Sequence, residues 1–212
     1  MRKNEERLDR IMKAKVTAEI RSEDIEAGKK TADTCLQGGI TSIEVSWTIP
    51  EAESLVQNLN DEKTEGVIIG AGAVINETMA EEAIKGGAEF LSAPNFSRSV
   101  CDAAVEHDIP YLAGCMTVNE MLAAEKHGAS MIRLFPGNQF TPDYVKAVKA
   151  SIPHLTVMPG GGVSLENIQA WFEAGASAAG IGSEFNRAGE QQDYEKVKQL
   201  AEAYLETVDK KE

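Results

Sequence analysis

Four stretches of the chain repeat one local pattern: CLQGGITSIEVS (35–46), AIKGGAEFLSA (83–93), AEKHGASMIRLF (124–135) and WFEAGASAAGIG (171–182). Each stretch ends a helical pattern, has a glycine where a helix C-cap favours positive φ, and then enters a short apolar strand. Those glycines are separated by 41 to 48 residues and are Gly39, Gly87, Gly128 and Gly175. A period of this length holds about two strand–helix units. The pattern therefore predicts a chain built from repeated strand–helix units.

Apolar runs between these stretches complete a set of eight predicted strands. They are VTAEIR (16–21), SIEVS (42–46), GVIIG (66–70), EFLSA (89–93), PYLAG (110–114), SMIRLF (130–135), HLTVMPG (154–160) and AAGIG (178–182). Helices are expected between them, for example at residues 22–37 after an N-cap at Ser22. Further helix caps are predicted at Asn76 and at Thr117, the latter in a capping box with Glu120.

Eight strands that alternate with eight helices predict one α/β domain over residues 1–212, a (β/α)8 TIM barrel. An additional helix within the N-terminal segment 1–14 is expected to cover the bottom of the barrel. A doubly wound sheet remains the alternative architecture.

The composition is that of a globular cytoplasmic protein, with 42% hydrophobic and 26% charged residues. No stretch approaches the ~20 apolar residues of a membrane span, and MRKNEERLDRIMKAK (1–15) lacks the apolar run of a secretory signal. Three scattered cysteines do not form a disulfide framework or a CxxC metal site. The formal charge of −13 argues against a nucleic-acid partner, although a local pocket can still bind a small anion. We expect no membrane partner and no cofactor.

Glycine-rich loops follow the last two predicted strands, in MPGGGVS (158–164) and GIGSEF (180–185). Barrels have their functional groups at the carboxyl ends of the strands, and glycines there let backbone N–H groups approach an anion. A helix that begins near Ser164 would add a favourable dipole. The alternative is that the three consecutive glycines form only a tight turn. We predict that phosphate or another anion binds at Gly161, Gly162, Gly182 and Ser183.

Charged side chains lie at or near the ends of three otherwise apolar strands: Arg21, Glu44 and Arg133. Strand alternation directs Glu44 and Arg133 into the barrel, where a charge is costly unless it is paired or bound to a ligand. We interpret Glu44 as functional, and Glu19, deeper in its strand, as the partner in a structural ion pair with Arg133. A metal site formed by Glu19 and Glu44 is a weaker alternative. No histidine lies at a strand end, so neither a Ser-His-Asp triad nor a histidine metal site is expected.

Six motifs, in this order and spacing, resemble those of the class I 2-keto-3-deoxy-6-phosphogluconate (KDPG) and 4-hydroxy-2-oxoglutarate (KHG) aldolases. They are IEVSWTIPEA (43–52), IGAGAVIN (69–76), GCMTVNEM (114–121), IRLFPG (132–137), MPGGGVS (158–164) and GIGSEF (180–185). The resemblance runs from about residue 8 to residue 205. It implies a homotrimeric (β/α)8 barrel, a lyase of carbohydrate metabolism that acts on 2-oxo sugar acids and releases pyruvate.

The resemblance also implies roles for individual positions. Glu44 matches the glutamate that shuttles protons, and the glycine loops with Ser183 match the phosphate site. Arg21 matches an arginine of many members and is expected to bind the substrate carboxylate. Pro94 and Phe135 match residues that frame the site. The remaining substrate position, Ala73, stands where the family's GAGT motif has a threonine.

Arg133 is the main departure, because the family has its imine-forming lysine at this position. A lysine amine can lose its proton and attack a ketone, whereas an arginine keeps its proton and presents only donors. Gly160 departs as well, since it replaces the threonine of the PTGG motif. We expect Glu44 and Arg133 to be the catalytic residues of a lyase-like protein that forms no imine and uses no metal. The alternatives are a non-catalytic binding protein for phosphorylated or 2-oxo sugar acids, and a phosphosugar isomerase or epimerase.

Overall fold

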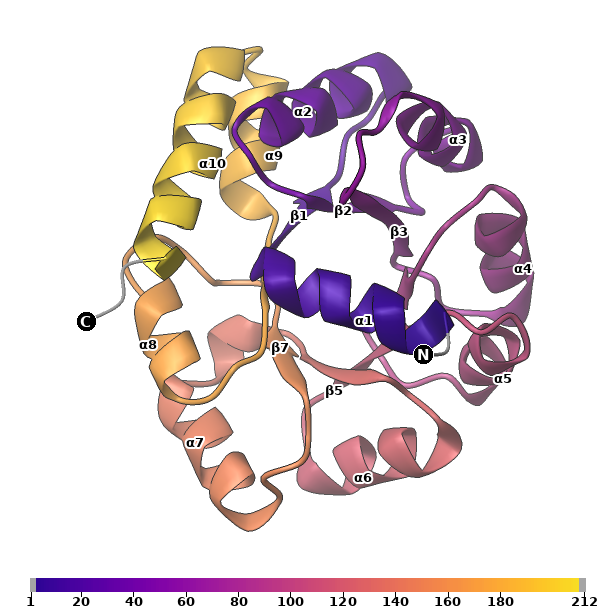
Figure 1. The fold of residues 1–212 in the computed structure, drawn as a ribbon, viewed down its shortest axis with the longest axis vertical. Coiled ribbons are helices and arrows are strands. Elements are labelled where there is room, and N and C mark those ends of the chain that lie inside the picture. The colour runs from indigo at the N-terminus through magenta and orange to yellow at the C-terminus, as the bar shows by residue number, and fades with distance from the viewer. Residues whose placement is uncertain (1–2, 210–212) are drawn as a thin grey trace.

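Eight short parallel strands form the centre of the protein, which a computed structural model describes for residues 3–209 (Figure 1). Their bounds are β1 Val16–Ile20, β2 Ser42–Ser46, β3 Ile68–Gly72, β4 Leu91–Ser92, β5 Tyr111–Cys115, β6 Met131–Leu134, β7 Val157–Pro159 and β8 Ala179–Ile181. Hydrogen bonds connect them in the order β7-β6-β5-β4-β3-β2-β1-β8. A bridge between Gly160 and Gly180 brings the two ends of this sheet together. The predicted (β/α)8 barrel is confirmed.

Helices surround the strands on all sides in Figure 1. Between residues 3 and 209, no helix combines the length and the apolar character that crossing a membrane requires. The helices are α1 Lys3–Ala14, α2 Ile25–Gln37, α3 Ala52–Glu62, α4 Glu77–Lys85, α5 Arg98–Glu106, α6 Val118–His127, the 3-10 helix η1 Gly137–Gln139, α7 Pro142–Ser151, α8 Ile168–Glu173, α9 Ser183–Glu190 and α10 Tyr194–Asp209.

The local signals that define the strand–helix units are found in the structure. The four repeated glycines have φ between 93° and 108°. Asn76 Oδ1 accepts from Met79 N at 2.9 Å as the N-cap of α4. Thr117 and Glu120 form the predicted capping box at the start of α6. These caps were predicted from side chains whose partners are local in sequence.

Three predictions about the helices were wrong. Helix α2 begins after an N-cap at Asp24, whose Oδ1 accepts from Ala27 N at 2.8 Å, and not after Ser22. The helix after β7 begins at Ile168 and not near Ser164, because Asn167 Oδ1 accepts from Ser164 N at 2.9 Å and holds a turn there. Two helices follow β8 where one was expected. The predicted domain also includes residues 1–2 and 210–212, which lie outside the described residues.

Helix α1 covers the amino-terminal end of the barrel, as Figure 1 shows, and this location agrees with the prediction. Its Ile11 is fully buried against a layer of apolar side chains inside the barrel. Burial of this layer removes apolar surface from water, which is the main driving force for closing that end. The layer consists of Ile68, Phe90, Leu112, Met131, Met158 and Ala178.

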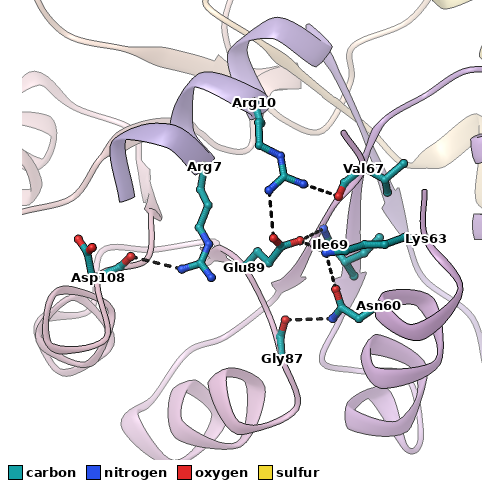
Figure 2. A network of polar contacts seen from close by, with 9 residues as sticks. All are labelled: Arg7, Arg10, Asn60, Lys63, Val67, Ile69, Gly87, Glu89 and Asp108. Atoms are coloured by element: carbon teal, nitrogen blue, oxygen red, sulfur yellow. Dashed lines mark hydrogen bonds and ion pairs between the residues drawn. The ribbon is translucent and has the colours of Figure 1, made fainter. Parts of the chain in front are cut away.

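A polar network at the same end fixes α1 to the strands (Figure 2). Glu89 lies at its centre: Oε1 accepts from Arg10 Nη1 at 3.1 Å, and Oε2 accepts from Ile69 N at 3.2 Å. Lys63 Nζ also pairs with Glu89 Oε2. Burial alone would raise the pKa of Glu89, but the hydrogen bond and charge of Lys63 hold that pKa below its ordinary value. Glu89 therefore joins three separate segments as a charged acceptor.

We expect the substitution Glu89→Gln to lower the free energy of unfolding by about 1–3 kcal/mol at pH 7, because it removes charge-assisted hydrogen bonds of a partly buried group. A depressed pKa in the folded state stabilises the protein above the unfolded pKa of about 4.3, and this stabilisation is lost as the pH falls below it. The difference from the native protein should therefore shrink between pH 5 and pH 3.

Urea unfolding across that pH range measures the effect. Glu82→Gln, on the exposed surface of α4, is the matched control and should cost within about 0.5 kcal/mol at every pH. Equal losses in the two variants would contradict the role assigned to Glu89.

Candidate active site

A cavity of about 390 Å³ opens at the carboxyl ends of the strands, away from α1. Parallel barrels have their functional sites at this end. The structure brings nine of the ten predicted site residues to the wall of this cavity, and only Gly162 is not among them. The nine are Arg21, Glu44, Ala73, Pro94, Arg133, Phe135, Gly161, Gly182 and Ser183.

Three charged side chains meet at the inner end of the cavity and are called here the charged triad: Glu19, Glu44 and Arg133. Arg133 Nη1 donates to Glu44 Oε2 at 3.1 Å, and Nη2 lies 2.7 Å from Glu19 Oε1. Nη1 also donates to Ser92 Oγ at 3.1 Å. The side chains of Arg133 and Glu44 are each only 6% exposed. One guanidinium is therefore held by two carboxylates with little access of water.

Strand register explains why these side chains meet. Glu19 on β1 and Glu44 on β2 are direct neighbours in the sheet. Both side chains point into the barrel, as does Arg133 on β6, because residues alternate between the two faces of each strand. The ion pair between Glu19 and Arg133 was predicted. Whether Glu44 also pairs with Arg133 was not decided from the sequence. Between residues 3 and 209, no group of three or more His, Cys, Asp or Glu side chains is arranged to hold a metal ion.

Burial has opposite consequences for the two kinds of charge. Burial raises the pKa of Glu44 to about 7, since the attraction of Arg133 lowers it only in part and the nearby charge of Glu19 raises it further. Burial disfavours the Arg133 cation, but the two carboxylates more than offset this and raise the pKa of Arg133. Glu44 can thus gain and lose a proton near neutral pH while Arg133 stays charged. Such a carboxyl group suits general acid–base chemistry.

Ala73, Pro94 and Phe135 form part of the rim, each just after a strand. Ala73 has a left-handed φ of 57° directly after β3. The ring centroid of Phe135 lies 5.3 Å from the Arg133 Cζ atom. Pro94 can pass over β5 because Gly114 has no side chain, and an added Cβ there would lie 2.1 Å from the Pro94 carbonyl carbon.

Helix α9 contributes a stripe of polar side chains to the mouth of the cavity, with the helical spacing i, i+3, i+4 and i+7. Its members are Ser183, Asn186, Arg187 and Glu190. The Asn186 side chain connects this helix to the end of β1: Oδ1 accepts from Arg21 N at 3.0 Å, and Nδ2 donates to Glu19 O at 3.0 Å. Two exposed cations, Arg21 and Arg187, therefore lie at the mouth, while the carboxylates of the triad lie inside.

The glycine loops lie at the same mouth, with one difference from the prediction. Gly161 lines the cavity in a left-handed conformation with φ of 78°. Gly182 directly precedes α9, whose first N–H groups have no partner within the helix. Gly162 instead packs against η1, where an added Cβ would lie 2.6 Å from the Asn138 Cβ atom. Gly161, Gly182 and Ser183 thus lie together, and Gly162 is separate from them.

Sequence reasoning did not select Ser92, Asn186, Arg187 or Glu190. Ser92 follows the inward alternation of its strand and was a detectable candidate. The helix residues were missed because only strand ends and loops were considered. The polar i, i+3, i+4, i+7 spacing that begins at Ser183 is the signal that would have found them.

Comparison with known proteins shows the family of this chain. The family model described as KDPG and KHG aldolase matches residues 8–200. The chain belongs to the KDPG and KHG aldolase family. It is 32% identical over 171 residues to the 2-dehydro-3-deoxy-6-phosphogalactonate aldolase of Escherichia coli strain K12, and the match covers 80% of this chain and 82% of that protein.

Two solved structures of similar fold extend the comparison. One, described as native KDPGal, superimposes with a TM-score of 0.85 at 28% identity, over 91% of this chain and 93% of that one. The KDPG aldolase from Legionella pneumophila, with pyruvate captured as a covalent carbinolamine intermediate, also gives a TM-score of 0.85. It is 22% identical and covers 93% of this chain and 97% of its own, so this likeness shows the fold alone.

We expect the substitution Glu44→Gln to change how stability depends on pH. The pKa of Glu44 is raised from 4.5 to about 7, so the folded protein keeps a proton that the unfolded chain has lost between these values. Stability of the native protein should therefore fall as the pH rises from 4.5 to 7, and a glutamine cannot contribute to this fall.

Urea unfolding of both proteins at pH 4.5, 6 and 8 measures the effect. Relative to the native protein, Glu44→Gln should gain on the order of 1–3 kcal/mol across this range. Glu82→Gln should keep a constant difference from the native protein. A constant difference for Glu44→Gln as well would show that Glu44 ionises at its ordinary pKa.

Proposed function

We propose that this member of the KDPG and KHG aldolase family is a carbon–carbon lyase that acts on a phosphorylated 2-oxo sugar acid and releases pyruvate without forming an imine. The observation that carries the proposal is the buried Glu44–Arg133 pair at the inner end of a cavity with cations and glycine loops at its mouth. A proton-transferring carboxyl and a permanent cation are the two groups that cleavage through an enolate requires.

The proposed reaction assigns each group a step. Glu44, as carboxylate, accepts the proton of the substrate's C4 hydroxyl while the C3–C4 bond breaks and the aldehyde product forms. The electron pair of that bond moves to the C2 carbonyl and forms the enolate of pyruvate. Arg133 stabilises the enolate oxygen, and Glu44 then returns the proton to C3, which completes pyruvate and regenerates the carboxylate. Arg21 is proposed to bind the substrate carboxylate, and Gly161, Gly182 and Ser183 the phosphate.

Proton uptake by Glu44 has a useful electrostatic consequence in this reaction. Before the step, Arg133 is paired with both carboxylates of the triad. Once Glu44 is neutral, the attraction between the two side chains weakens. The charge of Arg133 then becomes available when negative charge develops on the enolate oxygen.

Pyruvate release tests this proposal. We expect release from KDPG, from its 2-dehydro-3-deoxy-6-phosphogalactonate epimer or from 4-hydroxy-2-oxoglutarate, measured with a coupled pyruvate assay with and without divalent metal. Glu44→Gln should lower the rate by about 10²–10⁴-fold, whereas Glu82→Gln should leave it unchanged. Background rates for all three substrates under both conditions would overturn the proposal.

Borohydride trapping with pyruvate, read by intact mass, tests whether an imine forms. We expect no adduct on the native chain, because a guanidinium does not act as an amine nucleophile at physiological pH. The Legionella pneumophila enzyme, whose structure holds pyruvate as a covalent carbinolamine, is the positive control. An adduct on the native chain would show that another lysine reaches the cavity.

One observation favours a second candidate function, a binding protein for phosphorylated or 2-oxo sugar acids. Arg133 is already paired with two carboxylates, so its positive charge is compensated without a ligand. A binding protein should show a higher melting temperature with KDPG and no turnover. The lyase should show both ligand stabilisation and pyruvate release.

We further infer that the chain acts as a homotrimer in the cytoplasm. Family membership and the motifs that resemble those of the homotrimeric aldolases support the trimer. The ordinary globular composition and the few scattered cysteines support the location. Sedimentation velocity of the purified chain measures the mass of the assembly.

A further inference from the structure

Gly160, directly after β7, lies against the guanidinium of Arg133. A Cβ atom added to this glycine would lie 3.0 Å from both Cζ and Nη2 of Arg133, and 3.2 Å from Nε. The φ of Gly160 is not in the left-handed region, so the backbone conformation does not require a glycine. Its N–H donates to Leu134 O at 3.0 Å, as in an ordinary strand. Arg133 therefore occupies the space beside Gly160, and an added Cβ atom would fit only if the guanidinium moved by a few tenths of an ångström.

The two carboxylates of the charged triad also face glycines. A Cβ atom at Gly72 would lie 2.0 Å from Glu44 Oε1, and one at Gly180 would lie 1.9 Å from Glu19 Oε1. Neither glycine has a left-handed φ. Each of the three charged side chains thus occupies a space that a neighbouring strand leaves open, and none of them can move far without losing its partner.

Glu19 restrains the half of the guanidinium that Glu44 does not bind. Nη1 is used by Glu44 and Ser92, whereas Nη2 lies 2.7 Å from Glu19. The main chain of Glu19 is itself held, because its carbonyl oxygen accepts from Asn186 Nδ2. A hydrogen bond on Nη1 and an ion pair on Nη2 together restrict the rotation of the guanidinium.

We propose that Glu19 and Gly160 are positioning residues for the Arg133–Glu44 pair, Glu19 by holding Nη2 and Gly160 by leaving open the space against the guanidinium. On this basis the residues around position 133 specifically accommodate an arginine. That this positioning serves catalysis rests on the proposed function. The two contacts themselves can be measured in the absence of any substrate.

The role of Gly160 is tested by a double-mutant cycle with Arg133→Lys, which keeps the charge but removes the branched planar group. Gly160→Ala should lower the melting temperature by about 2–8 °C in the native background, since overpacking next to a restrained side chain is destabilising. In the Arg133→Lys background the decrease should be no more than about a third as large.

Gly28→Ala is the matched control for this cycle. Gly28 lies within α2, and a Cβ atom added there would make no contact shorter than 3.4 Å. The substitution should therefore be neutral or slightly stabilising in both backgrounds. Equal decreases for Gly160→Ala in the two backgrounds would overturn the role proposed for Gly160.

The role of Glu19 is tested by titrating the Glu44 carboxyl carbon by NMR in protein labelled with 13C-glutamate, with Glu44→Gln used for assignment. Glu19→Gln should lower the midpoint of the Glu44 titration by about one pH unit. The substitution removes a like charge near Glu44, and Glu44 is then the one carboxylate of the triad that pairs with Arg133. Glu190→Gln, an exposed acid of the same cavity outside the triad, should leave the midpoint unchanged. The same midpoint in Glu19→Gln and the native protein would overturn the role proposed for Glu19.

These results are distinguishable from the outcome of the pyruvate assay. If the chain is a lyase, Glu19→Gln should lower kcat more than it changes KM, because Glu19 acts through Arg133. If no substrate is cleaved, the melting temperatures and the Glu44 titration still decide whether Glu19 and Gly160 position the pair.

Discussion

The interaction on which the candidate site depends is the buried contact of one guanidinium with two carboxylates. Arg133, Glu44 and Glu19 share a space from which water is largely excluded, and removal of Arg133 would leave two carboxylates without their cation. Three glycines on neighbouring strands leave room for these side chains. The charged triad therefore constrains both the packing inside the barrel and the electrostatics of the cavity above it.

The two ends of the barrel differ in polarity and in access to water. At the amino-terminal end, an apolar layer and helix α1 exclude water, and Glu89 accepts hydrogen bonds from Arg10 Nη1 and Ile69 N. At the carboxyl end the same strands finish in charged side chains and glycine loops around an open cavity. In this fold the amino-terminal end generally contributes to stability and the carboxyl end carries the functional groups.

Family membership and the residue at position 133 point to different conclusions about chemistry. The chain belongs to the KDPG and KHG aldolase family over residues 8–200. A guanidinium, however, cannot form the imine, because it remains protonated at physiological pH. The raised pKa of Glu44 and the permanent charge of Arg133 favour chemistry through proton transfer and enolate stabilisation. Fold alone does not decide between such chemistries.

The sequence by itself determined the barrel, the glycine-terminated helices, the capping box at Thr117 and the inward direction of Glu44 and Arg133. Each of these follows from strand alternation or from contacts between residues close in the chain. Only the tertiary structure decided that Arg133 reaches both carboxylates, that Asn186 and Arg187 of α9 lie at the mouth, and that Gly162 packs away from the cavity. These facts depend on contacts between residues 24 to 167 positions apart in the chain, from Gly162 with Asn138 to Asn186 with Glu19. Periodicity within a segment carries no information about the distance and orientation of such distant partners.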